Sequence, residues 1–339
     1  MSPALSRMIL TSVLALLLIA AGCTSPISPK SPDVPVVYIV YGSEKGDLSY
    51  TDAAYRGIQA AQHDMPVTVR EFSPKDLETL APLLNSTTGR ERPGLVITVG
   101  FQYADLTRQL ALQHPDIRFL AIDTSGIGSG TVQAYEITSY GDSYLSGVLA
   151  ANATRTGHVG IILGMQSTLL DTFLRGYTDG ARAANRSIIV EHAYVRQNST
   201  EGFADPEQAG RIAEAMYRNG TDVIFMASGY SNTGGFDAAK TGAGRYVIGT
   251  DSDQSHLGPK IVLASAIKRV DRVVYNGISR YVNGIFTGGN TVAGLKEGVT
   301  GMIYNPEFEY HNATVSVWES RAQAAEAVDI TSRDQPGRA

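Results

Sequence analysis

Residues 205–229 read DPEQAGRIAEAMYRNGTDVIFMASG and contain one helix followed by one strand. Asp205 followed by Pro206 predicts a helix start, because proline fits the first helical turn, where its missing N–H is not needed. We expect this helix to end near Arg218. The run Asp222–Met226 then has the length and apolar composition of a buried strand, and the small residues after it are typical of a strand end. This stretch therefore predicts a helix packed beside a buried strand.

The same alternation of short apolar runs and amphipathic helices continues through most of the chain. Strands are predicted at 36–40, 95–99, 119–122, 158–163, 187–194, 222–226, 246–248 and 261–264. Helices are predicted at 50–63, 103–112, 144–154, 169–185, 205–218 and 268–283. Such alternation implies βαβ units and parallel sheets, so the fold class is α/β. Because the strands are too many for one comfortable sheet, we expect two lobes, each a doubly wound parallel sheet flanked by helices.

The length of the chain also favours two lobes of ordinary size. We expect the chain to cross between them near Ser139, Gly249 and Phe286. Lobe 1 then comprises residues 36–139 and 249–286, and lobe 2 comprises residues 140–248 and 287–320. Residues 321–339 are expected to form a disordered tail.

The first 22 residues have the pattern of a secretory signal peptide. Arg7 precedes an apolar stretch from Met8 to Ala21, and small residues then lead into Cys23, the only cysteine. The stretch is shorter than the roughly 20 residues of a comfortable membrane-spanning helix. A cysteine at this position suits a lipoprotein signal, in which the thiol receives a lipid; the alternative is an ordinary signal peptide or N-terminal anchor. Residues 23–35, rich in proline and serine, are expected to form an extended tether.

Composition and motifs exclude several classes of function. The formal net charge of −5 lacks the basic footprint of a nucleic-acid-binding protein. One cysteine allows no internal disulfide. The six histidines are scattered without metal-ligand spacing, and no nucleophile elbow, zinc-protease or P-loop motif is present. We therefore expect a binding protein that is not an enzyme and needs neither metal nor cofactor.

In open α/β sheets, ligands bind beyond the carboxyl ends of the strands. The residues at the predicted strand ends are Tyr41, Gly42, Gly100, Phe101, Asp123, Gly164, Met165, Ser228, Gly229 and Asp251. Among these, Asp123 and Asp251 carry carboxylates that can accept hydrogen bonds from a ligand. The alternative for each is an ordinary helix cap.

Several segments, in matching order and spacing, resemble the basic membrane protein (BMP) family, the solute-binding lipoproteins of ABC importers of the purine nucleoside receptor A type. These segments are 46–51, 99–101, 114–123, 173–181, 220–225, 247–254, 265–271 and 294–298. The resemblance spans about residues 36–304 and implies a two-lobed, periplasmic-binding-protein-like fold of type I. It also implies a monomer, lipid-anchored on the extracytoplasmic face of the cell membrane. Such a protein binds a nucleoside, mostly purine, between closing lobes and delivers it to a membrane permease.

The resemblance also implies roles for single residues. Tyr50 matches the family phenylalanine that stacks on the base. Asp251 and Lys268 match the pair that binds the ribose, although a plain salt bridge between the lobes is the alternative for this pair. Asp123 matches an aspartate that contacts the ligand, and Gly229 lies where the backbone approaches it closely.

The chain departs from the family pattern at the base end of the implied site. Tyr41, followed by Gly42, stands where the family usually has an aspartate, and Thr51 replaces an asparagine. We therefore expect the sugar preference to be kept and the base preference to be altered; the alternative is a ligand that is no nucleoside. Phe225 and Tyr230 are the candidates for a second aromatic wall. A surface sensor with the same fold and an enzyme of nucleoside metabolism are the competing functions.

Overall fold

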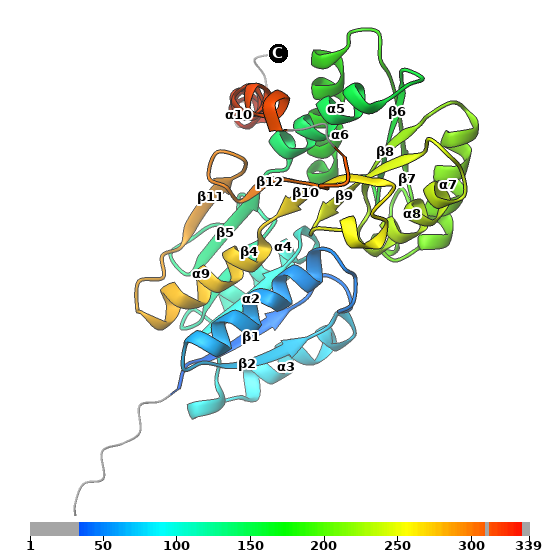
Figure 1. Ribbon diagram of the computed structural model, residues 1–339. Coiled ribbons are helices and arrows are strands. Elements are labelled where there is room, and N and C mark those ends of the chain that lie inside the picture. The colour runs from blue at the N-terminus through cyan, green and yellow to red at the C-terminus, as the bar shows by residue number, and fades with distance from the viewer. Residues whose placement is uncertain (1–33, 309–311, 334–339) are drawn as a thin grey trace, which may run out of the picture. The chain divides into compact units, whose positions relative to one another are not determined.

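A computed structural model describes residues 34–308 and 312–333 of the chain (Figure 1). The expected signal peptide, Cys23 and all but the last two residues of the tether lie outside the described residues. From Pro35 onward the chain forms one compact unit. Among the described helices, none combines the length and apolarity needed to cross a membrane.

The first sheet, called sheet A, contains six parallel strands in the order β11-β5-β4-β3-β1-β2. Its strands are β1 (Val36–Val40), β2 (Thr68–Phe72), β3 (Leu95–Val99), β4 (Arg118–Ile122), β5 (Val132–Ile137) and β11 (Gly289–Ala293). Its helices are α2 (Tyr50–Asp64), α3 (Leu77–Ser86), α4 (Ala104–Gln113) and α9 (Val270–Val282). Side chains of β1 alternate between two separate cores, because Val37 packs with α2 and α9 while Tyr38 packs with α3 and α4. Helices therefore cover both faces of sheet A.

The second sheet, sheet B, has the order β12-β10-β9-β8-β6-β7 and is parallel except for β12, which runs antiparallel to β10. Its strands are β6 (His158–Leu163), β7 (Ile189–Tyr194), β8 (Val223–Ala227), β9 (Tyr246–Asp251), β10 (Val262–Lys268) and β12 (Thr300–Tyr304). Its helices are α5 (Tyr140–Ala153), α6 (Thr168–Ala184), α7 (Pro206–Arg218) and α8 (Asn232–Lys240). Helix α10 (Asn312–Arg333) packs on α5.

Helices α5 and α6 approach each other closely at glycine positions. A Cβ atom placed on Gly180 would lie 1.9 Å from the backbone oxygen of Tyr144. A side chain there would push the two helices apart, so the glycine sets their spacing. Sheets A and B each have helices on both faces, which confirms the predicted α/β class with two doubly wound sheets.

Strand membership corrects two of the predicted crossings between the lobes. Both β9 and β10 belong to sheet B, so the second crossing follows Lys268 and does not lie near Gly249. Strand β11 belongs to sheet A, so the third crossing lies after Ala293 and not near Phe286. Sheet membership depends on pairing between strands distant in sequence, which a local apolar pattern does not encode.

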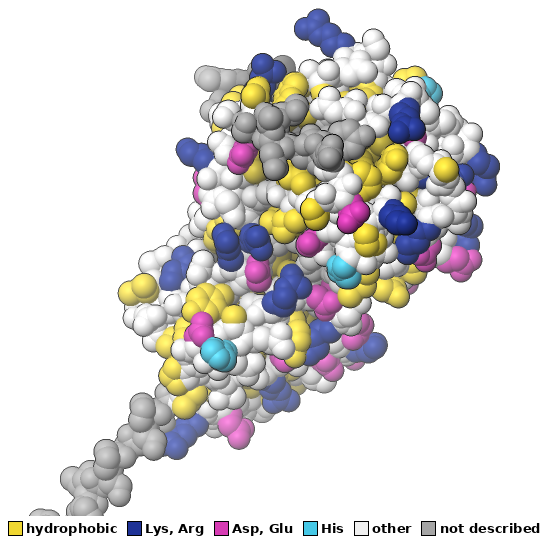
Figure 2. All heavy atoms as spheres, in the orientation of Figure 1, with side chains coloured by type: hydrophobic (Ala, Val, Ile, Leu, Met, Phe, Trp, Pro, Cys, Tyr) yellow, Lys and Arg dark blue, Asp and Glu magenta, His cyan; other side chains and the backbone are white. Residues whose placement is uncertain are grey.

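The C-terminal part of the chain differs from the expected tail. Helix α10 runs to Arg333, so residues 321–333 are helical, and residues 334–339 lie outside the described part. The surface seen in Figure 2 carries charged side chains of both signs, scattered over this face without one large basic patch.

Candidate functional site

Three residues at neighbouring loops hold an unusual backbone conformation. Leu48, Asp123 and Asp251 have φ values of 54°, 59° and 66°, and they are the non-glycine residues with positive φ in the described chain. Such conformations cost of order 1 kcal/mol each and gather at functional sites. Asp123 directly follows β4, and Asp251 is the last residue of β9. These backbone outliers mark the carboxyl ends of both sheets as the candidate site.

A buried ion pair joins the two sheets at this place. Lys268, the last residue of β10, lies with its Nζ 2.7 Å from Oδ2 of Asp123, and the two side chains are 3% and 2% exposed. The Tyr50 hydroxyl interacts with the same carboxylate, whose Oδ1 is buried. Burying an ion pair costs desolvation energy that its attraction barely repays. A charged pair kept in the interior at the strand ends is therefore a candidate for contact with a polar ligand.

Two aromatic rings flank the Lys268 ammonium group. Its Nζ lies 5.5 Å from the ring centroid of Tyr50 and 5.7 Å from that of Phe173. Both distances fall in the cation–π range. The Tyr50 hydroxyl is buried beside the Asp123 carboxylate and interacts with it. Burial, and next the Asp123 carboxylate, raise the pKa of this phenol well above its usual value, so the hydroxyl stays protonated.

Asp251 presents a carboxylate from the other side of the ion pair. Oδ2 of Asp251 accepts a hydrogen bond of 2.5 Å from the Ser49 hydroxyl. Burial raises the pKa of Asp251 to about 6, against the lowering effect of Lys268. The residue keeps some exposed surface, and at neutral pH it is mostly ionised. The site thus gathers Tyr50, Asp123, Asp251 and Lys268, all four of which the sequence predicted.

The residues expected to contact the base instead make contacts within the protein. The Tyr41 hydroxyl donates to Oε2 of Glu71 at 2.7 Å, and the ring is 2% exposed in the core of sheet A. Thr51 is fully buried, with its hydroxyl 2.6 Å from that of Ser43. A Cβ atom on Gly42 would lie 2.6 Å from the backbone oxygen of Val99. The structure does not bring Tyr41, Gly42 or Thr51 into contact with the ion pair.

The proposed second aromatic wall also needs correction. Phe225 is fully buried within β8, where its ring packs against those of Tyr177 at 5.5 Å and Phe173 at 6.4 Å. It is a core residue of sheet B. Tyr230, by contrast, is 41% exposed beyond the end of the same strand.

Phe203 is an aromatic residue at the strand ends that the sequence analysis missed. A Cβ atom on Gly164, which follows β6, would lie 2.4 Å from the Phe203 ring. One on Gly229, which has φ +60°, would lie 3.2 Å from the Phe203 backbone oxygen. The two glycines therefore leave room for the partly exposed Phe203 at the carboxyl edge of sheet B. A phenylalanine between glycine and a helix-capping Asp-Pro pair is the signal that could have found it.

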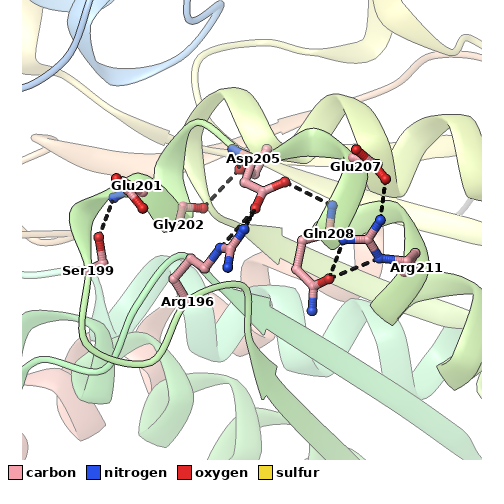
Figure 3. Close-up of polar contacts among 9 residues, drawn as sticks. Arg196, Ser199, Glu201, Gly202, Asp205, Glu207, Gln208 and Arg211 are labelled. Atoms are coloured by element: carbon pink, nitrogen blue, oxygen red, sulfur yellow. Dashed lines mark hydrogen bonds and ion pairs between the residues drawn. The ribbon is translucent and has the colours of Figure 1, made fainter.

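Polar contacts hold the segment that carries Phe203 (Figure 3). Asp205 caps α7 by accepting from the backbone N–H of Gln208 at 3.0 Å, and it also accepts from Nε of Arg196 at 2.9 Å. The Ser231 hydroxyl donates to the backbone oxygen of Gly202 at 2.8 Å. These contacts hold the backbone on both sides of Phe203 at the carboxyl edge of sheet B.

Metal chemistry has no candidate centre in the described residues, where no group of three or more histidine, cysteine or acidic side chains could hold an ion. The donors and acceptors at the strand ends instead suit a polar organic molecule with a flat apolar part.

Comparison with known proteins identifies the family. The model of the Bmp family, described as ABC transporter substrate-binding protein PnrA-like, matches residues 34–329. The chain belongs to the Bmp family. Basic membrane protein A1 of Borrelia garinii subsp. bavariensis is 32% identical over 288 residues, which is 81% of each chain. Basic membrane protein D of Borreliella burgdorferi is 30% identical over 315 residues, covering 89% of this chain and 90% of that protein.

A solved structure extends the likeness to the fold. An ABC transporter solute-binding protein from Aeropyrum pernix K1 matches with a TM-score of 0.72 and 24% identity, covering 87% of this chain and 86% of that one. As a Bmp protein, the chain is the extracytoplasmic substrate-binding component of an ABC transporter. It therefore takes a small-molecule ligand and works with a permease. The resemblance predicted from the sequence is confirmed.

Proposed function

We propose that this Bmp protein binds a nucleoside, with a purine preferred, between its two lobes. The observation that supports this most is the buried Lys268–Asp123 pair beside the Tyr50 ring, with the Asp251 carboxylate close to Lys268. The Tyr50 ring offers a flat surface to a base. Asp251 offers carboxylate oxygens to the two neighbouring hydroxyls of a ribose, and Asp123 accepts a further hydrogen bond.

The expected energies fit such a ligand. Stacking of a base on an aromatic ring contributes about 1–3 kcal/mol. Hydrogen bonds to charged groups contribute about 1.5–3 kcal/mol each. One stack and three such bonds sum to about 5.5–12 kcal/mol, a range that includes the roughly 8 kcal/mol of a micromolar complex before the costs of association are subtracted. The ordered site keeps those costs low.

The residues expected near the base support a preference for a different base from that of the family pattern. Tyr41 and Thr51 stand where the family pattern has an aspartate and an asparagine, and both hydroxyls are hydrogen-bonded inside the protein. No carboxylate is then offered to a purine amine at this position. We place Phe203, in place of Phe225, as the second wall facing Tyr50, because it lies at the carboxyl edge of sheet B and keeps some exposed surface.

Isothermal titration calorimetry with a panel of compounds tests the proposal. The panel contains inosine, guanosine, adenosine, uridine, hypoxanthine and ribose. At least one nucleoside should bind and raise the melting temperature by mass action, while free ribose should not. Asp251→Ala should abolish this binding, and Tyr50→Ala should weaken it by about tenfold or more. A panel in which no nucleoside binds, or an Asp251→Ala protein of unchanged affinity, would contradict the assignment.

A further inference from the structure

Ser49 holds the N-cap position of α2 without capping the helix. Serine at this position usually accepts a hydrogen bond from a backbone N–H of the first turn. The Ser49 hydroxyl makes no such bond. The Asp47 carboxylate does the capping, accepting from the backbone N–H groups of Ser49 and Thr51 at 2.9 and 2.8 Å. The Ser49 hydroxyl is thereby released from the usual role of its position.

This hydroxyl points to the other sheet. It donates to Oδ2 of Asp251 at 2.5 Å, and the backbone oxygen of Thr250 lies 3.4 Å away. Ser49 introduces a helix of sheet A, whereas Asp251 ends a strand of sheet B. The side chain of Ser49 is fully buried in this contact. A buried hydroxyl that reaches across the sheets fixes the direction of the carboxylate it meets.

Two further hydrogen bonds join the same two segments. The Ser252 hydroxyl donates to the backbone oxygen of Ser49 at 3.1 Å. Nε2 of Gln254 donates to the backbone oxygen of Leu48 at 3.2 Å. Leu48 has the positive φ of 54°, so these bonds compensate for a strained backbone. The segments 48–49 and 251–254 therefore dock onto each other as a unit.

We propose that Ser49 is a positioning residue, which orients the Asp251 carboxylate toward the ligand when the two sheets come together. The inference rests on the proposed function in so far as Asp251 accepts hydrogen bonds from the ligand. Each carboxylate oxygen has two lone pairs, so Asp251 can accept from Ser49 and still bind two ligand hydroxyls. Because Tyr50 follows Ser49 directly, these two adjacent residues place both the stacking ring of Tyr50 and the Asp251 carboxylate.

Titratable groups surround Asp251 from several elements. They are Lys268 on β10, Asp123 after β4, Asp47 before α2, Asp142 on α5 and the Tyr50 phenol. Burial raises the pKa of Asp251 to about 6, while Lys268 and the Ser49 hydroxyl lower it. Loss of the hydroxyl must therefore raise this pKa further, because the ionised carboxylate loses a hydrogen bond.

Ser49→Ala tests the proposal with two measurements. In ligand-free protein, the titration midpoint of the Asp251 carboxyl carbon, followed by NMR, should rise by about one unit. In calorimetry at pH 6.5, inosine should bind about threefold more weakly than to the wild type, and the difference should shrink by pH 8.5, where Asp251 is ionised in both proteins. An unchanged midpoint would overturn the proposal.

Ser252→Ala is the matched control. It removes the bond to the Ser49 backbone and a bond accepted from Arg56 on α2, and it leaves the Asp251 carboxylate untouched, so the midpoint should stay at its wild-type value. Equal losses of affinity in Ser49→Ala and Ser252→Ala at every pH would show that Ser49 only joins the segments, which would also overturn the proposal. If no nucleoside binds the wild type, the proposed function fails, while the NMR midpoint still decides the role of Ser49.

Discussion

The backbone conformation and the burial of Asp251 both reduce the stability of the folded protein. Its backbone has positive φ, and burial raises its pKa to about 6. An aspartate that folding leaves harder to ionise lowers the free energy of unfolding at neutral pH. Two other buried acids, Asp142 and Glu326, also have raised pKa values. Such costs are typical of functional positions, where stability and activity oppose each other.

Replacing Asp251 by asparagine should stabilise the protein at neutral pH. Because the folded pKa lies above the unfolded value of 3.8, the folded state binds the proton more tightly. This contribution to stability is fully present below about pH 4 and is lost as the pH rises through about 6. At pH 7, Asp251→Asn should therefore exceed the wild type by up to about 3 kcal/mol. Urea unfolding at pH 4, 5, 6 and 7 measures the difference, which should grow with pH.

The exposed neighbour Asp253 supplies the control for this change. Asp253→Asn should leave the pH dependence of the unfolding free energy as it is in the wild type, since the side chain is exposed at the surface. An Asp251→Asn protein that loses stability more steeply than the wild type between pH 4 and 7 would contradict the raised pKa.

The sequence predicted some site residues well and others poorly, for a geometric reason. Strand position placed Asp123 and Asp251, because the carboxyl ends of parallel strands share one edge, whereas Lys268, expected at a helix start, was found only through the family resemblance. Phe225 lies inside a strand, where the face it occupies depends on the register of the sheet. Tyr41 follows a strand end, but Glu71 on the neighbouring β2 draws its hydroxyl away. Register and side-chain direction come from long-range contacts.

At the scale of elements, helix α10 connects two of the crossings between the lobes. Oε1 of Glu326 accepts from the backbone N–H of Gly141 at 2.9 Å, and Oε2 accepts from that of Leu295 at 2.9 Å. Gly141 lies in the first turn of α5, just after the first crossing, and Leu295 lies within the third. The sequence analysis took most of this helix for a tail, because its alanines and charges form no broad apolar face. The helix nevertheless buries Ala322, with Trp318 and Ala325 beside it, in an apolar cluster with α5.

Removing the Glu326 side chain should loosen both crossings. Glu326 is 3% exposed, so Glu326→Ala leaves two buried N–H groups without their acceptor. Each unsatisfied group costs about 1–3 kcal/mol, and the free energy of unfolding should fall by at least about 2 kcal/mol. Hydrogen exchange at the amides of Gly141 and Leu295 should accelerate more than in the strands of either sheet.

Glu319→Ala provides a control on the same helix. Glu319 is exposed, so its removal should change the unfolding free energy by less than about 0.5 kcal/mol. Equal exchange rates at Gly141 and Leu295 in Glu326→Ala and Glu319→Ala would contradict the role of Glu326 as a link between the crossings.

For the whole molecule, the fold class could be predicted from local sequence patterns. The division into lobes could not, because it depends on pairing between strands distant in sequence. Short apolar strands alternating with helices were enough to predict two doubly wound sheets, which the structure and the family confirm. The positions at which the chain crosses between the lobes were harder to predict from the sequence. Strand β11, reading Gly289–Ala293, has little apolar character, yet it joins the edge of sheet A beside β5. Edge strands need less burial, so their apolar signal is weak.

The last prediction concerns the attachment of the whole molecule to the membrane. We expect Cys23 to carry a lipid, with residues 24–35 as the link to the folded unit. Twelve residues span at most about 40 Å when extended, which would keep the binding site near the permease at a high effective concentration. Cys23→Ser should therefore bind inosine like the wild type in calorimetry but move from the membrane to the soluble fraction. Uptake of labelled nucleoside by cells should fall with it, and a Cys23→Ser protein that stays in the membrane fraction would refute the lipid anchor.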